Sequence, residues 1–235
     1  MSGRLRQWFT MRLQRHKRLR VFDDIRRNNF WGGKESVSGP GSDLEATAML
    51  RRDLPMLLDQ LQPKRLLDVP CGDFHWMQHL PLDGLEYIGG DLLPSLIERN
   101  RILYGTARRR FMVVDLCAGP LPDADLLLVR DCLGHLSFAD IERAFRVIRT
   151  SRVAWVLLTH FTVTDPNIDI PTGRWRPLNF TKPPFSMPEP HHSLPDGWPD
   201  GDPIYEYKTL SLWRRDDLPE SLNGVPHVNP IVDPA

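Results

Sequence analysis

Three aspartates each come at the end of a short apolar run, where their carboxylates could bind a small molecule. They are Asp68, Asp91 and Asp115. Asp91 comes about 20 residues after Gly72, and an acid at that distance beyond a glycine turn holds the hydroxyls of a ribose in dinucleotide-binding folds. This spacing predicts a nucleoside site built from the ends of neighbouring strands.

The loop after the first run narrows the chemistry of the ligand. The stretch "LLDVPCGDFHW" (66–76) has one glycine, Gly72, and its Pro70 lacks a backbone N–H. A pyrophosphate needs several free N–H groups and little negative charge, but Asp68 and Asp73 make this loop acidic. Acids beside a glycine turn suit a cationic ligand. S-adenosylmethionine (SAM) carries an ammonium and a sulfonium and has no phosphate, so the loop predicts SAM.

The runs that carry these residues read as strands of one sheet. Strands are expected at 65–69, 85–91, 110–115, 124–131 and 153–161, with 204–215 closing the sheet as an antiparallel edge. The first five are almost continuously apolar, which is typical of parallel strands covered by helices on both faces. Alternation of strands and helices predicts a doubly wound, Rossmann-like α/β fold, in a single domain over 35–235.

Helices are expected between these strands. Ser42 and Glu45 form a capping-box pattern that should open a helix, which Pro55 would kink or divide. Ser137 and Asp140 form a second such pattern at the start of "FADIERAFRVIR".

The charge of the chain is balanced overall but uneven along its length. Lys and Arg number 30, as do Asp and Glu, so the net charge gives no sign of a polyanionic partner. Residues 1–34 nevertheless hold ten basic residues and only two acids. This segment predicts a basic helical extension that either lies on an anionic membrane or an acidic partner, or packs on its own domain with its arginines in solvent. We favour the packed form. The side chains expected on the apolar side of this helix are Leu5, Trp8, Phe9, Leu13 and His16.

The cysteines and the hydropathy indicate a compartment. Cys71, Cys117 and Cys132 are odd in number and lack metal-site spacing, so reduced thiols are expected. No apolar run approaches the ~20 residues that cross a bilayer, and the N-terminus lacks the apolar core of a secretory signal. We therefore expect a cytoplasmic protein.

Seven motifs taken together resemble one family. They are "FWGGKESVSGPGS" (30–42), "LLDVPCGDFHWM" (66–77), "YIGGDLLPSLIERN" (87–100), "FMVVDL" (111–116), "LLLVRDCLGHLS" (126–137), "TDPNIDIPTGRWRPLNFTKPPF" (164–185) and "YKTLSLWRR" (207–215). The set resembles class I SAM-dependent methyltransferases, in the branch whose first motif reads "DVPCGDFxWM". The resemblance implies a seven-stranded sheet and methyl transfer. A looser likeness to bacterial sugar O-methyltransferases, including those of mycobacterial methylated mannosides, implies a carbohydrate acceptor in polysaccharide assembly.

The same resemblance implies which residues bind SAM. Asp91 takes the ribose hydroxyls, Asp115 accepts a hydrogen bond from the adenine amino group, and Arg130 faces the methionine end. The full set that it implies is Asp68, Pro70, Cys71, Gly72, Asp73, Trp76, Asp91, Leu92, Asp115, Leu116 and Arg130.

Methylation of a hydroxyl needs a group that takes its proton, and His135 is the expected base. Asp131 lies four residues earlier, so one helical turn would bring its carboxylate to the imidazole and fix the tautomer. Alternatively, His135 caps the next helix or closes over SAM. His160 is a weaker candidate, with a core position as its more frequent fate. Asp131 could instead help to bind a divalent ion such as Mg²⁺.

The segment 164–203 is rich in proline and is expected to be a substrate loop. Its polar and aromatic side chains would hydrogen-bond and stack on a sugar, or else they pin the loop to the body of the domain. The expected substrate-binding residues are Trp31, Glu35, Ser38, His160, Asn167, Asp169, Arg174, Trp175, Arg176 and Asn179.

Three functions are compatible with these features. The favoured one is a SAM-dependent O-methyltransferase acting on a carbohydrate or other small molecule. The basic N-terminus would suit a nucleic-acid methyltransferase, but the Asn/Asp-Pro-Pro-aromatic box of base-methylating enzymes is replaced by "RDCL" after the fourth strand. The third is a non-catalytic SAM-binding scaffold. The acceptor, the metal requirement and the oligomeric state stay open at this level.

Overall fold

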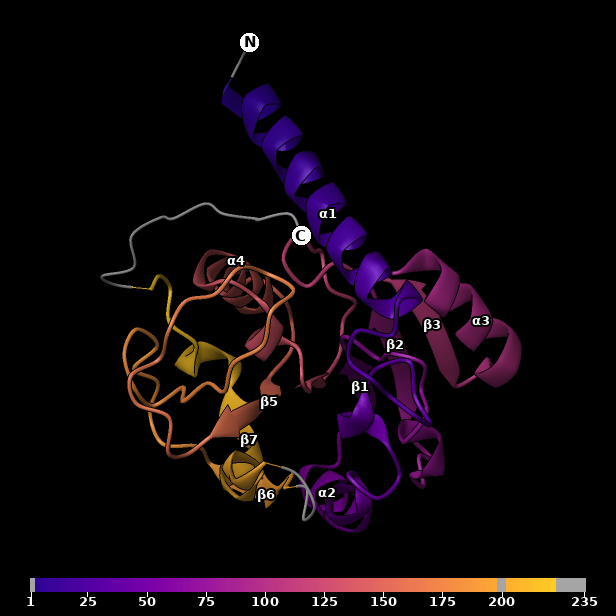
Figure 1. The fold of residues 1–235 in the computed structure, drawn as a ribbon. Coiled ribbons are helices and arrows are strands. Elements are labelled where there is room, and N and C mark those ends of the chain that lie inside the picture. The colour runs from indigo at the N-terminus through magenta and orange to yellow at the C-terminus, as the bar shows by residue number, and fades with distance from the viewer. Residues whose placement is uncertain (1–2, 198–201, 223–235) are drawn as a thin grey trace.

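A seven-stranded sheet forms the centre of the molecule (Figure 1). The computed structural model describes residues 3–197 and 202–222, with side chains from Arg12 onward. The strand order is β3-β2-β1-β4-β5-β7-β6, with β7 antiparallel to both of its neighbours. This confirms the doubly wound, mostly parallel α/β fold. The strands are β1 (Arg65–Asp68), β2 (Glu86–Asp91), β3 (Arg109–Val113), β4 (Leu126–Val129), β5 (Trp155–Phe161), β6 (His192–Pro195) and β7 (Lys208–Arg214).

The α-helices largely follow the predicted signals. They are α1 (Gly3–Arg27), α2 (Ala48–Leu61), α3 (Pro94–Tyr104) and α4 (Phe138–Arg149). The side chain of Ser137 caps α4 by accepting a hydrogen bond from the Asp140 N–H, as predicted.

The start of α2 differs from the prediction. Ser42 belongs to a short 3-10 turn (Pro40–Ser42), and α2 begins only at Ala48. The hydroxyl of Thr47 donates to the Asp43 carbonyl, so the chain makes a separate turn before the helix. Pro55 lies inside α2 without dividing it.

The last part of the sheet also departs from the prediction. The expected strand 204–215 begins with a 3-10 turn (Pro203–Tyr207), and β7 occupies only its second half. β7 is not the edge, because β6 pairs with its outer side. β6 was not predicted from the sequence, because it is four residues long, contains a proline and buries only Leu194.

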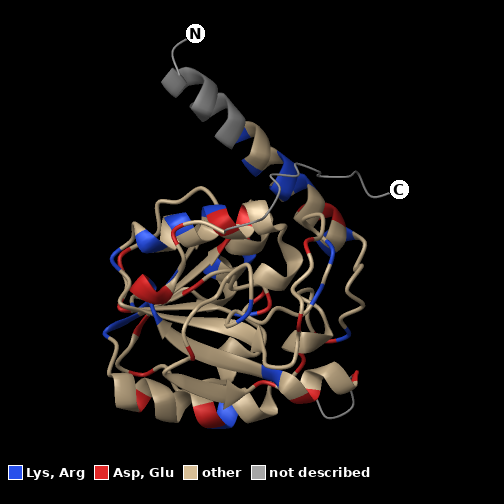
Figure 2. Cartoon of the chain, turned by 90° about the vertical axis from the view of Figure 1, so that its left-hand side faces the viewer, with Lys and Arg blue, Asp and Glu red and all other residues tan. Residues whose placement is uncertain are grey.

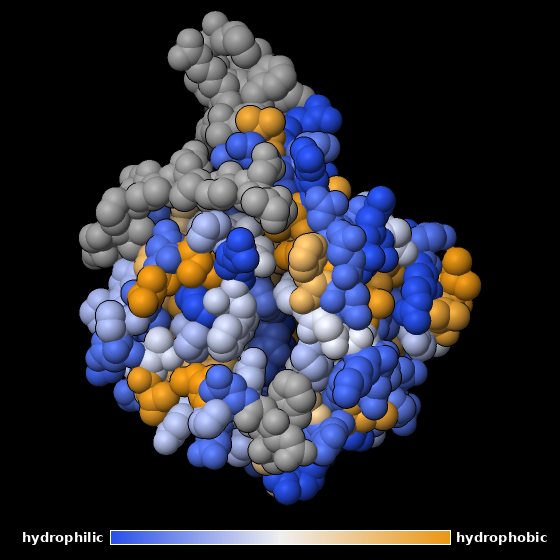
Figure 3. Space-filling model, viewed as in Figure 1, coloured by the Kyte–Doolittle hydropathy of each residue, from blue (hydrophilic) through white to orange (hydrophobic). Residues whose placement is uncertain are grey.

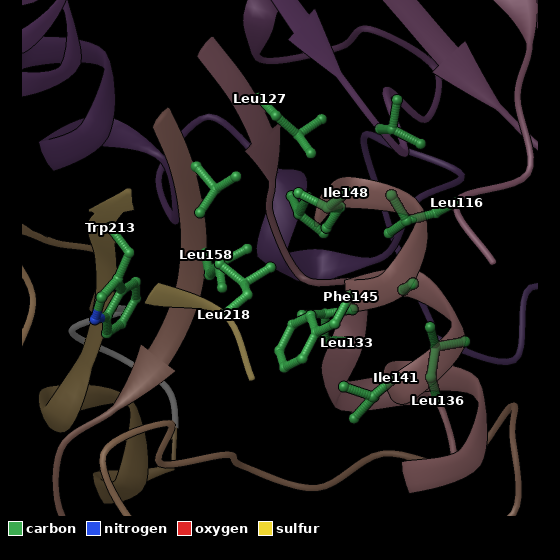
Figure 4. Packing of buried hydrophobic residues seen from close by; sticks show 14 of the residues in the cluster. Leu116, Leu127, Leu133, Leu136, Ile141, Phe145, Ile148, Leu158, Trp213 and Leu218 are labelled. Carbon is green, nitrogen blue, oxygen red and sulfur yellow. The ribbon is translucent and has the colours of Figure 1, made fainter. Parts of the chain in front are cut away.

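Two apolar clusters lie on opposite faces of the sheet. Successive residues of β4 alternate between them, with Leu127 in one cluster and Leu128 in the other. The first cluster contains residues of α4, such as Ile141 and Phe145 in Figure 4, and residues of the loop around Phe180. The second contains residues of α2 and Ile97 of α3. With both faces covered, ligands can reach the sheet at the ends of its strands.

Helix α1 lies against the domain with its C-terminal half, while its N-terminal end projects away (Figure 1). Gln14, Arg18 and Ile25 are buried, whereas Leu13 and His16 are exposed. The predicted apolar side is therefore wrong for the two of its residues that can be assessed. Leu5, Trp8 and Phe9 lie outside the described side chains.

The exposed side of α1 is basic. Lys and Arg follow one another along its described part, and this surface is mostly hydrophilic (Figures 2 and 3). Within residues 3–197 and 202–222, no helix combines the length and the apolar character needed to cross a bilayer.

Candidate cofactor-binding and catalytic site

A pocket opens at the carboxyl ends of β1, β2 and β4 and is closed on one side by α1. Asp68 and Asp91 end β1 and β2, and Asp115 follows β3 by two residues. All eleven residues that the sequence assigns to SAM line this pocket. Four other predicted residues line it as well: Trp31, Ser38, Asp131 and His135.

The backbone N–H groups of the glycine loop donate to acceptors within the protein. The N–H of Cys71 donates to Gly90 and that of Phe74 to Cys71. The N–H of Gly72 donates to the Asp91 carboxylate at 3.3 Å, and that of Asp73 to the Ser38 hydroxyl at 3.3 Å. Since these N–H groups already have protein partners, they are not available to a phosphate. The observed geometry supports the prediction of a phosphate-free ligand.

Gly72 is required by its neighbour across the pocket mouth. Its φ is +53°, and a Cβ there would collide with the side chain of Ser38. Asp73 ties the two segments together, because its carboxylate accepts from the Ser36 hydroxyl (2.8 Å) and the Val37 N–H (3.0 Å). Ser38 and Asp73 are also hydrogen-bonded to each other, so we propose that both residues hold the two segments of the pocket together. Ser36 was not identified from the sequence.

Asp68 and Asp91 are buried carboxyls with few charges to compensate them. Burial raises the pKa of Asp68 to about 7, although the hydroxyl of Tyr87 donates to it at 2.6 Å. Burial also raises the pKa of Asp91 to about 6, against the effect of the Leu93 N–H at 2.9 Å. Both groups are poised to become more acidic when a cation or a row of donors binds beside them.

This electrostatic state predicts a pH dependence of ligand affinity. Below pH 6 both acids are largely protonated in the free protein, and a neutral acid binds an ammonium poorly. S-adenosylhomocysteine (SAH) retains the ammonium, so its affinity should fall at least about tenfold from pH 7.5 to pH 5.5. Calorimetry across this range should also detect proton release on binding. An Asp68→Asn variant should flatten the profile above pH 6, and a flat profile in the unmodified protein would contradict the assignment.

Asp115 has a partner that the sequence did not suggest. One carboxylate oxygen accepts from the Cys117 N–H at 2.9 Å, and the other pairs with the guanidinium of Arg18 at 2.8 Å. Arg18 comes from α1, is only 2% exposed and also pairs with Asp140 at 2.9 Å. Arginines of α1 were expected in solvent, so this burial corrects the prediction for Arg18.

A second group of buried charges forms the wall near β4. Arg130 and Lys208 pair with Asp196 at 2.8 and 3.2 Å, and Lys208 pairs with Asp131 at 2.8 Å. Burial alone would raise the pKa of Asp131, but the charges of Lys208 and Arg130 hold it well below its usual range. Two cations therefore occupy the carboxylate once considered for a divalent ion. In the described part of the chain, no group of three or more His, Cys, Asp or Glu is arranged to hold a metal.

Removal of Asp196 should destabilise the fold. Its side chain is fully buried between Arg130 and Lys208, and truncation leaves these cations with one carboxylate fewer. Asp196→Ala should lower the free energy of unfolding by about 3–5 kcal/mol. Denaturant titration measures this, with Asp216→Ala at an exposed ion pair as the control expected to change it by less than about 1 kcal/mol. A change below that level for Asp196→Ala would contradict the argument.

His135 is held by a backbone group rather than by Asp131. Its Nδ1 lies 3.0 Å from the carbonyl oxygen of Arg174, which can only accept, so Nδ1 carries the proton. The Arg174 carbonyl, and not Asp131 as predicted, therefore fixes the tautomer. Asp131 has a φ of +48°, so no helical turn joins it to His135. Burial lowers the pKa of His135 to about 4, against the opposing effect of the Asp131 charge, leaving a neutral ring with an unprotonated Nε2. The Trp31 ring lies 5.0 Å from the imidazole.

Most of the polar side chains in the proline-rich loop are used within the protein. Arg176 donates to the carbonyls of Leu133, Gly134, Leu136 and Ile168. Asn167 donates to the Asn179 carbonyl and Asn179 to the Thr162 carbonyl, and Asp169 accepts from the Phe138 N–H at 2.7 Å. None of these four lines the pocket. They pin the loop, as the alternative reading predicted, and the sugar-binding reading is not supported for them.

The remaining predicted residues lie around the site. Glu35 does not line the pocket: its carboxylate accepts from the Leu44 N–H and contacts the ring of His75, which does line it. His160 is 3% exposed beside Phe180, and burial lowers its pKa to about 4, so it is a neutral core histidine. Arg174 contributes its carbonyl to His135, and Trp175 stays 42% exposed beside Tyr205.

Comparison with known proteins places the fold but not the family. No family model matches the chain, and no curated protein matches it in sequence. Human N-acetylserotonin methyltransferase, solved with SAM, aligns at a TM-score of 0.50 and 11% identity, over 72% of this chain and 52% of the human one. The chain thus spans about half the length of that enzyme. The methyltransferase domain of bacterial CtHen1-C aligns at a TM-score of 0.52 and 15% identity, over 71% and 97% of the two chains. At these identities the likeness shows a methyltransferase-type fold and nothing finer.

Proposed function

We propose that this chain is a SAM-dependent methyltransferase that methylates a hydroxyl group of a small-molecule acceptor. The observation that carries the proposal is the meeting of Asp68, Asp91 and Asp115 with His135 around one pocket. The resemblance of the sequence to class I enzymes and the fold shared with the two methyltransferases above support it independently.

We assign different parts of SAM to different residues along the pocket. SAM, when bound, supplies an activated methyl group on a sulfonium. We assign the ribose hydroxyls to Asp91, the adenine amino group to Asp115 and the ammonium to the side of Asp68. The N–H groups of Gly72 and Asp73 already donate within the protein, and the acids of the loop favour the positive end of the ligand.

His135 is the proposed base for the acceptor hydroxyl. Its Nδ1–H is fixed on the Arg174 carbonyl, so Nε2 is the atom that takes the proton. Burial keeps the ring neutral at physiological pH, and the Trp31 ring against it offers a flat apolar surface to the acceptor. We therefore assign acceptor positioning to Trp31.

We propose a carbohydrate as one acceptor class, on the strength of the exposed Trp175 ring and the resemblance to sugar O-methyltransferases. The pinned state of Arg176, Asn167, Asn179 and Asp169 removes much of the expected hydroxyl recognition. Other hydroxyl compounds, including flat aromatic ones that could stack on Trp31, therefore belong in the same proposal.

An acceptor screen with methyl-labelled SAM tests the function. It covers sugars, glycolipids, phenolic compounds and RNA, with and without Mg²⁺. Label transfer to a hydroxyl compound is the expected result. Transfer to RNA alone would replace the proposal with nucleic-acid methylation, and SAH binding with no transfer to any class would favour a scaffold.

A further inference from the structure

The sequence predicts a membrane, partner or packing role for α1 but no role in the cofactor pocket, and yet residues of this helix line it. Arg18, Phe22 and Arg26 of this helix line the pocket together with the residues after β3. The helix can approach closely because a side chain at Gly173, whose φ is +102°, would collide with Val21. α1 is therefore a wall of the site.

Arg18 is held there by acids from two elements. Its two terminal nitrogens pair with Asp115 and with Asp140, at 2.8 and 2.9 Å. Asp140 is itself fixed, since it accepts from Arg143 at 2.7 Å and from the Thr172 hydroxyl at 2.7 Å. The guanidinium thus has one orientation, which it passes on to the carboxylate of Asp115.

The third nitrogen of the guanidinium, Nε, is not used in these ion pairs. The Nε of Arg18 is buried and has no hydrogen-bond partner among the described residues. A buried donor without an acceptor is unfavourable, because it has given up its hydrogen bonds to water and gained none in the protein. On the wall of a pocket, a ligand atom is the natural acceptor.

We propose that Arg18 determines specificity for adenine in this pocket. It orients Asp115 to accept from the exocyclic amino group, and its own Nε–H donates to a ring nitrogen beside that group. Adenine presents a donor and an acceptor side by side, and this pair presents the complementary acceptor and donor. The proposal rests on the proposed SAM site and adds to it a residue from outside the sheet and its covering helices.

Two ligands distinguish a specificity role from a merely structural one. SAH carries the amino group, while S-inosylhomocysteine carries an oxygen in its place and would face the Asp115 carboxylate with a second acceptor. The unmodified protein should bind SAH at least about 100-fold more tightly than S-inosylhomocysteine. Arg18→Met should weaken SAH by about 10- to 100-fold and reduce the discrimination by at least about tenfold. Arg20→Met, at an exposed position of the same helix, is the control and should change neither.

Each outcome of this calorimetric comparison supports or overturns the proposed role of Arg18. If Arg18→Met weakens both ligands equally, leaves both unchanged or tightens SAH, the inference is overturned while the SAM site stands. If the unmodified protein binds no SAH, the proposed function itself fails. If Arg18→Met does not fold, Arg18→Lys takes its place. Lysine keeps the charge but lacks the Nε–H, so reduced discrimination supports the inference and full discrimination overturns it.

Discussion

His135→Ala should lower kcat by about 100-fold or more, because it removes the group that takes the acceptor proton. Binding of SAH should change by less than about threefold, since the imidazole is assigned to the acceptor and not to the cofactor. The measurement is steady-state methyl transfer to the acceptor found in the screen, with SAH titration alongside. His79→Ala, at an exposed histidine outside the pocket, is the matched control and should keep full activity.

The pH profile adds a second readout. The pKa of His135 is lowered to about 4 by burial, so the ring is already the unprotonated base above about pH 5. kcat should therefore show no loss attributable to this histidine from pH 6 to pH 9. An ascending limb near pH 6.5 that His135→Ala abolishes would contradict the lowered pKa. Full activity of the alanine variant would remove His135 from the chemistry.

Asp91→Asn should reduce SAH affinity by about 100-fold or more. The carboxylate is assigned to two ribose hydroxyls, and each hydrogen bond to a charged group contributes about 1.5–3 kcal/mol. Calorimetry gives the dissociation constant directly. Glu86→Gln, at the half-exposed start of the same strand, is the control and should bind SAH normally.

The same substitution should leave the thermal stability of the ligand-free protein almost unchanged at neutral pH. Burial raises the pKa of Asp91 to about 6 in the folded chain, above the ordinary aspartate value of about 3.9. Above pH 6 the buried charge therefore costs stability, and the neutral amide avoids this cost. The amide NH2 must, however, face one of the two N–H donors, those of Gly72 and Leu93, from which the carboxylate accepts, and this opposes the gain. Because the two effects offset each other, a thermal melt of Asp91→Asn at pH 7.5 should show a midpoint within about 5 °C of the unmodified protein. A much lower midpoint together with lost binding would mean that Asp91 is structural.

The strand ends could be predicted from sequence for a geometric reason. Parallel strands in a doubly wound sheet place their carboxyl ends on one edge, so acids that follow separate strands must converge. Asp68, Asp91 and Asp115 needed only the strand assignment, and that assignment rested on long apolar runs. The cap at Ser137 was predictable for a similar reason, since it depends on residues three apart.

Contacts between distant segments escaped prediction. The buried face of α1 carries Gln14 and Arg18, which look solvent-exposed by residue type, and only the acids of two other elements make Arg18 a buried residue. Asn100 on α3 was missed in the same way: its amide donates to the Gly72 carbonyl at 2.7 Å. A polar residue among the buried Leu96 and Ile97 was the signal that could have identified it.

The sugar-binding role predicted for the proline-rich loop was not supported for a different reason. A segment without regular structure has backbone carbonyls that no neighbouring strand or helix satisfies, so side chains must donate to them. Arg176 and Asn167 do this inside the molecule. Their residue types suit sugar recognition equally well, and sequence alone does not tell the two uses apart.

The most direct test of the account is calorimetric titration of the unmodified chain with SAH at pH 7.5. The acidic strand ends, the glycine loop whose Gly72 and Asp73 N–H groups already have protein partners, and the arginine of α1 together predict saturable binding of one SAH per chain, with release of protons. A titration without saturable heat, in a protein shown to be folded, would contradict the assignment of this pocket to SAM and every role derived from it.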